Sequence, residues 1–600
     1  AQKEQLLLEL VAELPLTQTL RMTRDAREQA LLWKLRKGLY PSVGAVRQSG
    51  TAVIIEDVVF PPQRLAEGIH GLQQLFEAHG YTRAQKTGGI IFGHAMDANI
   101  HFVLTQSFAT DAEIARYDAF MQDLVRYVTQ LGGALKAEHG TGRNIAPFVV
   151  AEWGETALAV MQELKHAVDP LGLLNPGVIL SDDSQAHLHH LKDLPTIDPE
   201  VDRCTECGFC ETVCPSRRVT LTPRQRIVLR RERERLKQGG HTSRLAALDA
   251  AYVYEGLETC ATDSLCASAC PIGIDTGALV KRLRADDHTA LQQREAKWAA
   301  TGFALLEQGI RSALSLGHLG QTLGVSKPMN FVLAEVARRL KSPLPRWQKH
   351  LPPANWKPLP SSVADAAEFV YFPSCLSRTM GYAERDPLPT VIMNLAQAAG
   401  LRLYLPEAVS HQCCGLPMGS KGFPQADAQL ADKSVDMLWK ACQHGRLPVV
   451  MDTSPCTYHL QERLRARGIT LLDFVDFSDR YLLPRLRLTP VYTHLYVHPV
   501  CSVQKMELAP ALLRIAQQCA HRVSAPMTAT CCGTAGDRGL LYPELTQAAL
   551  SDVQHQITQD PPDMICASSR SCEMGVSLTL EREVISVAHI LWSACQEAHV

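Results

Sequence analysis

The chain has 600 residues, of which 46% are hydrophobic and 20% are charged, and its formal net charge is −2. This balance gives no electrostatic reason to expect nucleic acid as a partner, and no apolar run approaches the roughly 18 residues that span a bilayer. The length exceeds what one hydrophobic core can organise, so we expect several domains. The 19 cysteines gather in clusters without a secretory signal. That pattern favours metal ligands in the reducing cytoplasm over a disulfide framework.

Residues 1–180 are predicted to form the first domain, a mixed unit of helices and strands. TAVIIEDVVF (51–60) has the β-branched density of a buried strand. A capping box from Thr110 to Glu113 opens an amphipathic helix, and the glycine pair after residue 131 ends it. Residues 181–200 are polar and contain prolines, which indicates a linker.

Three motifs in this unit contain chemically active side chains: IFGHAMDANIHF (91–102), EHGTGRNIAPF (138–148) and VDPLGLLNPGVIL (168–180). On one straight strand His94 and His101, seven residues apart, would face opposite ways. The polar residues between them predict a turn that brings both imidazoles to a common point. Two histidines and a carboxylate with open positions suit a divalent metal such as zinc or manganese.

In this order the motifs resemble the C-terminal, substrate-binding domain of FAD-linked 2-hydroxy acid oxidases and dehydrogenases, which include D-lactate and D-2-hydroxyglutarate dehydrogenases. The resemblance implies that Glu138 is the third metal ligand. It also implies that His139 is the base that takes the substrate hydroxyl proton, a role that suits an imidazole titrating near neutral pH. Arg47, with Thr51 beside it, matches the site of the substrate carboxylate, and Asn175 matches a loop close to the flavin.

Two departures from this family bear on the substrate and on FAD. Relatives selective for D-2-hydroxyglutarate carry a lysine where this chain has Ile55, so the cation for a second carboxylate is expected elsewhere, with Arg143 a candidate, or the substrate has one carboxylate. No stretch resembles the domain that binds the FAD pyrophosphate, and the chain starts at Ala1. We therefore expect that domain upstream or on another chain, and this fragment to be inactive without it.

Residues 201–345 are predicted to form a helical domain with two iron–sulfur clusters. CTECGFCETVCP fits C-x2-C-x2-C-x3-C-P, in which the fourth cysteine ligates the other cluster. The second run, CATDSLCASACP (260–271), has Asp263 where a cysteine is expected. The crossing rule assigns Cys204, Cys207, Cys210 and Cys270 to one [4Fe-4S] cluster, and Cys214, Cys260 and Cys266 to the other.

Several readings of Asp263 remain open at this stage. The carboxylate can bind the fourth iron, although it is a harder ligand than a thiolate. A water or a distant cysteine can take that position, or the iron is labile and a [3Fe-4S] cluster remains. In the fourth reading Asp263 is a solvated turn residue.

After a proline-rich linker at 346–366 the chain repeats itself, as residues 367–488 and 489–600. YFPSCLSRTMG, HQCCGLPMG and DTSPCTYHL each return 116 to 126 residues later in altered form. These copies resemble the CCG domains of heterodisulfide-reductase-type proteins and of iron–sulfur subunits of flavin dehydrogenases, whose cysteines can bind further clusters. Thr453 and Ser569 replace the first cysteine of each closing pair, so a structural or redox-active thiol role stays open. The match is carried by Cys375, Cys413, Cys414 and Cys456, and by Cys501, Cys531, Cys532 and Cys572.

The predicted fold class is multidomain: an α+β oxidase cap domain, a helical two-cluster ferredoxin-like domain and duplicated α/β CCG domains. This order resembles fused bacterial dehydrogenases of the D-2-hydroxyglutarate type. It implies oxidation of a D-2-hydroxy acid to the 2-oxo acid, with hydride passing to FAD and electrons leaving through the clusters to a quinone or another carrier. D-lactate is the alternative substrate, and a non-catalytic electron-transfer subunit is the alternative function. A homo-oligomer and peripheral contact with the inner membrane are compatible with the sequence.

Overall fold

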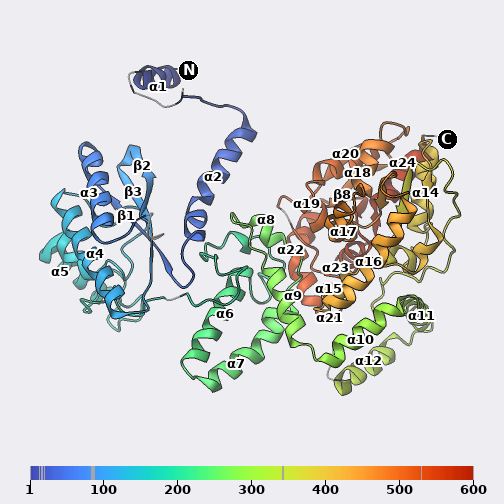
Figure 1. Ribbon diagram of the computed structural model, residues 1–600, viewed down its shortest axis with the longest axis horizontal. Helices are drawn as coiled ribbons and strands as arrows, with labels where there is room; N and C mark the ends of the chain where they lie inside the picture. The colour runs from blue at the N-terminus through green and yellow to red at the C-terminus, as the bar shows by residue number, and fades with distance from the viewer. Residues whose placement is uncertain are drawn as a thin grey trace. The chain divides into compact units, whose positions relative to one another are not determined.

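The computed structural model describes residues 2–12, 14, 18, 20–82, 88–192, 194–340, 344–528 and 530–598. The chain forms two compact units (Figure 1). The first contains Ala1–Thr196 and Asp202–Cys207, and the second contains Ile197–Val201 and Gly208–Val600. None of the described helices combines the length and the apolarity that crossing a bilayer requires.

The first unit is built on an antiparallel sheet in the order β1-β3-β2. The strand predicted at 51–60 is β1, and the helix predicted after Thr110 is α4, which opens with the predicted capping box and ends at Gln130, just before the glycine pair. Both predictions are confirmed. The elements of this unit are α1 (Gln2–Ala12), α2 (Ala26–Ala45), β1 (Ala52–Val59), α3 (Leu65–Ala78), β2 (Ile90–His94), β3 (Asn99–Gln106), α4 (Asp111–Gln130) and α5 (Val149–Val168).

One face of this sheet packs on α3 and α4, and the other face carries polar groups and contacts α2. Ile100, Phe102 and Leu104 of β3 lie in one hydrophobic cluster with side chains of α3 and α4, which Figure 1 shows beside the sheet. Because side chains alternate along a strand, the residues between them point to the opposite face. His101 is one of these residues.

The helical part of the second unit covers the predicted ferredoxin-like segment. Its helices are α6 (Pro223–Gln238), α7 (Thr242–Tyr252), α8 (Leu265–Ala269), α9 (Thr276–Asp287), α10 (Ala290–Thr301), α11 (Phe303–Thr322) and α12 (Ser326–Leu340). The first cysteine run precedes α6, and the second spans α8, which contains Cys266.

The remainder of the second unit contains two parallel sheets of the same topology, with orders β5-β4-β6-β7 and β9-β8-β10-β11. This agreement confirms the duplication expected from the cysteine spacing. The strands are β4 (Phe369–Phe372), β5 (Leu403–Tyr404), β6 (Val449–Met451) and β7 (Leu471–Asp473), then β8 (Tyr492–His498), β9 (Ala520–Ser524), β10 (Met564–Ala567) and β11 (Val584–Ser586).

The covering helices occupy equivalent places in the two copies and share one continuous hydrophobic core. In copy 1 they are α13 (Cys375–Thr379), α14 (Leu388–Ala398), α15 (Leu416–Gly419), α16 (Pro424–Ala441), α17 (Ser454–Ala466) and α18 (Phe474–Phe477). In copy 2 they are α19 (Cys501–Lys505), α20 (Ala509–Cys519), α21 (Arg538–Leu541), α22 (Pro543–Gln559), α23 (Arg570–Leu580) and α24 (Val587–Glu597).

Candidate active site and cofactor sites

The strand register of the first unit gathers polar side chains on the face opposite α3 and α4, where Arg36 of α2 lies 3.4 Å from His94 Nε2. Asp57 of β1 lies directly opposite His101 of β3, and Phe92 of β2 lies opposite His101 on its other side. His94 is two residues beyond Phe92 and therefore shares this face. The turn between β2 and β3 contains Ala98 in the left-handed region, with φ of 51°. This hairpin brings the two imidazoles together, with ring centroids 5.3 Å apart.

Glu138 completes a group of three ligand atoms. Its Oε1 lies 2.8 Å from His101 Nε2 and 3.1 Å from His94 Nε2. All three atoms lie within 4.8 Å of one another, which fits one divalent ion with open coordination positions. Burial, and then the neighbouring His139, lower the pKa of His101, which favours the neutral imidazole that a metal binds. The arrangement fits the predicted zinc or manganese site, which remains a prediction.

The loop that carries Glu138 is held by Asp57, a carboxylate with no exposed surface. Its Oδ2 accepts hydrogen bonds from the backbone N–H groups of Ala137, Glu138 and His139 at 3.2, 2.7 and 3.2 Å. Burial acts to raise the pKa of Asp57, but these N–H groups outweigh it and the pKa is lowered. Lys136 adds a positive charge 3.6 Å from Oδ1. Asp57 is therefore an ionised anchor for the loop.

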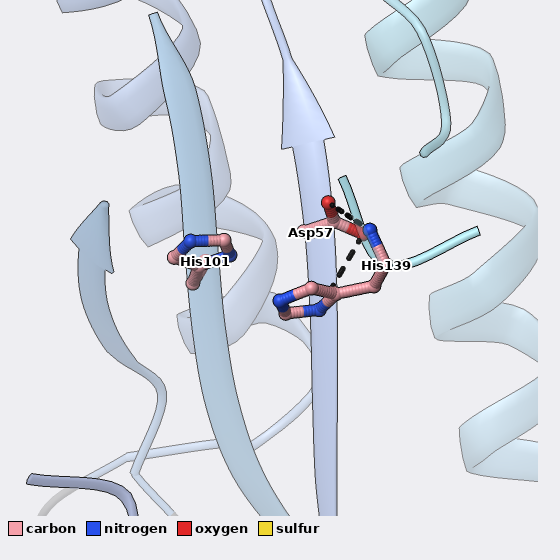
Figure 2. Close-up of side chains that lie close together, drawn as sticks. All are labelled: Asp57, His101 and His139. Atoms are coloured by element: carbon pink, nitrogen blue, oxygen red, sulfur yellow. Dashed lines mark hydrogen bonds and ion pairs between the residues drawn. The ribbon is translucent and has the colours of Figure 1, made fainter. Parts of the chain in front are cut away.

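His139 lies beside His101 and Asp57 (Figure 2). Its ring stacks on that of His101 at 4.7 Å, and 37% of its side chain is exposed. Nδ1 lies 3.7 Å from Asp57 Oδ1, an oxygen that accepts no hydrogen bond among the described residues. A proton on Nδ1 would face this anion, which leaves Nε2 to accept a proton from a substrate. Nε2 lies 3.9 Å from the Glu138 carboxylate, beside the metal ligands.

The residues predicted to bind substrate do not all join this group. The guanidinium of Arg47 is buried, and each of its nitrogens donates to backbone carbonyls. The acceptors are Gly44, Thr51, Asp202, Arg203 and Cys204, at 2.7 to 3.0 Å. These five bonds use the five N–H groups of a guanidinium, so the structure does not support a carboxylate-binding role for Arg47. It ties the first cysteine motif to the end of α2.

The other three predicted residues lie on loops or turns. Thr51 bonds to the carbonyl of Gln48 at 2.8 Å and belongs to the same turn as Arg47. Arg143 is exposed, four residues after His139. Asn175 adopts a left-handed conformation, with φ of 44°, in a turn closed by Val178. Ile179 then donates to the carbonyl of Gly142 at 3.0 Å, so the Asn175 loop is attached to the loop of His139.

A cavity in the second unit unites the second predicted cluster set. Cys214, Cys260, Cys266 and Asp263 line it together, with Arg226 beside them. Asp263 Oδ1 accepts a hydrogen bond from the N–H of Leu265 at 3.0 Å, the Cys531 thiol faces the carboxylate, and the buried Oδ2 has no oxygen or nitrogen partner among the described residues. A buried carboxylate oxygen whose polar neighbours are thiols fits a ligand of iron and does not fit a solvated turn residue. The other predicted set is divided between the units, with Cys204 and Cys207 in the first and Cys210 and Cys270 in the second.

The duplicated domains each gather their four predicted cysteines. In copy 1 the sulfur atoms of Cys375 and Cys413 lie 3.9 Å apart, and those of Cys414 and Cys456 lie 3.1 Å apart. In copy 2 the same pairing joins Cys531 to Cys501 and Cys532 to Cys572. The hydroxyls that replace the missing cysteines are satisfied by neighbours, since Thr453 donates to Ser374 at 2.9 Å and Ser569 bonds to Ser571 at 3.1 Å.

Asp57, Lys136 and Arg226 were not predicted as site residues. Asp57 could have been identified from the sequence, because two adjacent carboxylates inside a β-branched strand are expected to be buried and therefore to need polar partners. Lys136 forms ion pairs with Asp57 and with its neighbour Glu56. It lies two residues before the predicted ligand Glu138, but no sequence motif marks it. Arg226 lies in an ordinary basic helix, and only the packing of α6 shows that it is buried.

Comparison with known protein families agrees with this division of the chain. Residues 1–179 match the C-terminal domain of FAD linked oxidases, residues 200–274 match a 4Fe-4S dicluster domain, and residues 369–461 and 495–577 match a cysteine-rich domain named CCG. The chain therefore combines three kinds of domain that belong to FAD-linked and iron–sulfur oxidoreductases. This confirms the expected domain types and fold class.

Relatives match different parts of the chain. The glycolate oxidase subunit GlcD of Escherichia coli is 26% identical over 188 residues, which is 31% of this chain and 32% of that protein. A D-lactate dehydrogenase of Anaerostipes hadrus is 29% identical over 149 residues, 24% of this chain and 29% of that protein. One subunit of the anaerobic glycerol-3-phosphate dehydrogenase of E. coli is 23% identical over 420 residues, 66% of this chain and 99% of that protein. The chain thus spans about a third of the two oxidase-type relatives.

Proposed function

We propose that the chain acts in the oxidation of a D-2-hydroxy acid to its 2-oxo acid. The observation that supports this most is the convergence of His94, His101 and Glu138 on one point, with the imidazole of His139 beside them and oriented by Asp57. A structural domain has no need of this arrangement. The proposal is that a hydride leaves C2 of the substrate, a proton leaves its hydroxyl group, and the carbon becomes a ketone.

In this mechanism the divalent ion would polarise the hydroxyl group and FAD would accept the hydride. The protein supplies positioning and one proton acceptor. His139 Nε2 takes the hydroxyl proton, while Asp57 stabilises the resulting imidazolium from the Nδ1 side. Asp57 also fixes the backbone of residues 137–139, so the base and the Glu138 ligand keep their relative positions.

D-2-hydroxyglutarate is the substrate we favour, with D-lactate as the alternative of the same chemistry. Its second carboxylate needs a cation, and Arg143 is exposed on the loop that follows His139. Arg47 does not meet this need, because backbone carbonyls occupy its guanidinium. The substrate class therefore depends on Arg143 in this proposal.

Electrons would leave through the cysteine-rich half. We propose one cluster on Cys204, Cys207, Cys210 and Cys270. The second cluster would use Cys214, Cys260, Cys266 and the Asp263 carboxylate. Iron–sulfur centres accept one electron at a time, so they would divide the pair delivered by the flavin.

The test is anaerobic dye reduction by FAD-loaded holoprotein, with D-2-hydroxyglutarate, D-lactate and glycolate offered separately. We expect the highest kcat/KM with D-2-hydroxyglutarate, and a selective loss of that preference in Arg143→Gln. Equal rates with D-2-hydroxyglutarate and D-lactate, in wild type and in the variant, would contradict the substrate assignment. Reduction by none of the acids, with intact flavin and metal, would favour the second candidate, an electron-transfer subunit, which the match to nearly the full length of a glycerol-3-phosphate dehydrogenase subunit supports.

A further inference from the structure

Copy 2 of the duplicated domain contains a histidine that no motif identifies. His498 ends strand β8, three residues before Cys501, and none of its surface is exposed. Its ring nitrogens have no oxygen or nitrogen partner within the described part of the chain, and the Cys532 thiol is the polar group that they face. An imidazole that is buried without an oxygen or nitrogen partner and lies against thiols is a candidate metal ligand.

The ring lies against the thiols of the same copy. His498 contacts Cys532, which also faces Cys572 and accepts a hydrogen bond from Thr534 Oγ1 at 3.1 Å. Cys531, the next residue, faces Cys501. The four thiols and the imidazole therefore surround a common buried region at the carboxyl ends of β8 and β10, where parallel strands present ligands.

Copy 1 shows that the fold does not need this histidine. The residue three positions before Cys375 is Phe372, which ends β4 and is 1% exposed. An apolar ring fills the same place there without unused polar atoms. The difference between the copies is therefore chemical, since both lack one cysteine of the closing pair and copy 2 has an imidazole where copy 1 has a phenyl ring.

We propose that His498 is a ligand of a polynuclear iron–sulfur centre held by Cys501, Cys531, Cys532 and Cys572. Within the described residues, no three thiols of copy 2 converge on a single point. They form a row of neighbours from Cys501 through Cys531 and Cys532 to Cys572, an arrangement that suits several metal atoms better than one. Imidazole can replace thiolate on iron, and it raises the reduction potential when it does so.

The surroundings favour an electron-accepting centre over a structural zinc ion. The Cys531 thiol lies beside the Asp263 carboxylate, and Cys531 packs in one cluster with Ala261 and Leu265 from the second cysteine run. The copy 2 centre would thus share a wall with the cavity of the second predicted cluster. A structural zinc ion would be complete with four thiolates and would leave the imidazole unused.

Pulsed EPR on the anaerobically prepared and reduced 600-residue chain tests this inference without any substitution. Protein grown with ¹⁵N-histidine should show an imidazole nitrogen coupling on a reduced iron–sulfur signal, and iron and acid-labile sulfide should exceed the amount that two ferredoxin-type clusters need. An iron content that two clusters explain would overturn the proposal. So would zinc in place of the additional iron.

The variants His498→Phe and His498→Cys separate ligation from packing. His498→Phe copies the residue of the other domain and should lose the nitrogen coupling together with the copy 2 signal. His498→Cys restores a ligand and should keep the iron while losing the coupling. The matched control is His494→Gln on the same strand, because His494 is equally buried but bonds to Ser524 at 2.7 Å, and this variant should keep the coupling. A coupling that survives in His498→Cys, or an unchanged spectrum in His498→Phe, would refute ligation by His498.

Discussion

Arg226 offers a quantitative test of the second cluster. Its guanidinium is 1% exposed and donates to the carbonyl of Gly256 at 2.7 Å, to Ser216 Oγ at 3.1 Å and to Cys214 Sγ at 3.9 Å. No partner of this guanidinium among the described residues is a carboxylate. Burying a cation without an anion is unfavourable, so the negative charge is expected to come from the thiolates and from the cluster that we propose they hold. We therefore expect Arg226→Gln to lower the reduction potential of this cluster.

The size of the shift follows from Coulomb's law. Two unit charges 4 Å apart interact by about 4 kcal/mol at an effective dielectric constant of about 20. The electron added on reduction spreads over the cluster, so a mean separation of about 6–7 Å and an interaction of about 2.5 kcal/mol are more realistic. For a one-electron couple, in which about 59 mV corresponds to 1.4 kcal/mol, this is a fall of about 100 mV.

An EPR-monitored redox titration of anaerobic protein measures the shift. The other proposed cluster, on Cys204, Cys207, Cys210 and Cys270, would serve as the internal reference and should keep its potential. Arg226→Lys retains the charge and should move the potential much less than Arg226→Gln, which separates charge from packing. If Arg226→Gln retains its iron and both potentials stay within about 20 mV of wild type, far below the Coulomb value, the cavity does not hold the charge that we assign to it.

Four further substitutions examine the other sites. Replacing His139 with Ala should lower kcat by about 10²–10⁴-fold with intact flavin and metal, and turnover near wild type would remove its role as the base. Asp57→Asn should lower activity or metal affinity by about 10–100-fold, measured by steady-state kinetics and metal titration. Unchanged values would mean that the 137–139 loop keeps its conformation without the Asp57 carboxylate. Asp263→Cys should change the spectrum and potential of one cluster only, and two unchanged clusters would exclude ligation by this residue. Burial lowers the pKa of His589 to about 4. Unfolding leads to protonation below the ordinary pKa of about 6.5, so stability is complete above that pH and falls by up to ~1.4 kcal/mol per unit on the way to pH 4. Urea unfolding of His589→Phe should show a flatter pH profile, and a slope equal to that of wild type would refute this assignment.

Elements with strong local signals could be predicted from the sequence. The strand β1 follows from its β-branched run, and α4 follows from a capping box and a glycine stop, both of which act within a few residues. The duplication could be predicted because the cysteine spacing repeats. The turn between His94 and His101 could also be predicted. Residues seven positions apart face opposite ways on a straight strand, and the residues between these two are polar.

Features that depend on register and on distant packing could not be predicted. The position of Asp57 opposite His101 is a property of the β1–β3 pairing, which no local pattern specifies. Arg47 shows the converse difficulty. Its motif resembles a carboxylate-binding site, but residues 202–204, more than 150 positions away, provide the carbonyls that occupy it. Only tertiary structure reveals which polar groups have already been satisfied.

The two duplicated domains show that the cysteine motif determines where the thiols lie but not which charged groups surround them. Cys375 and Cys501 begin the helices that follow β4 and β8, and the carboxyl ends of parallel strands meet at one edge of each sheet, so backbone topology alone brings the thiols together. The charges around them come from elsewhere. Arg378 beside the copy 1 thiols pairs with Glu307 of α11 at 3.1 Å, whereas copy 2 faces His498 and Asp263. Ligand positions can therefore persist through a duplication while the groups that set a reduction potential diverge, because the fold constrains the former and not the latter.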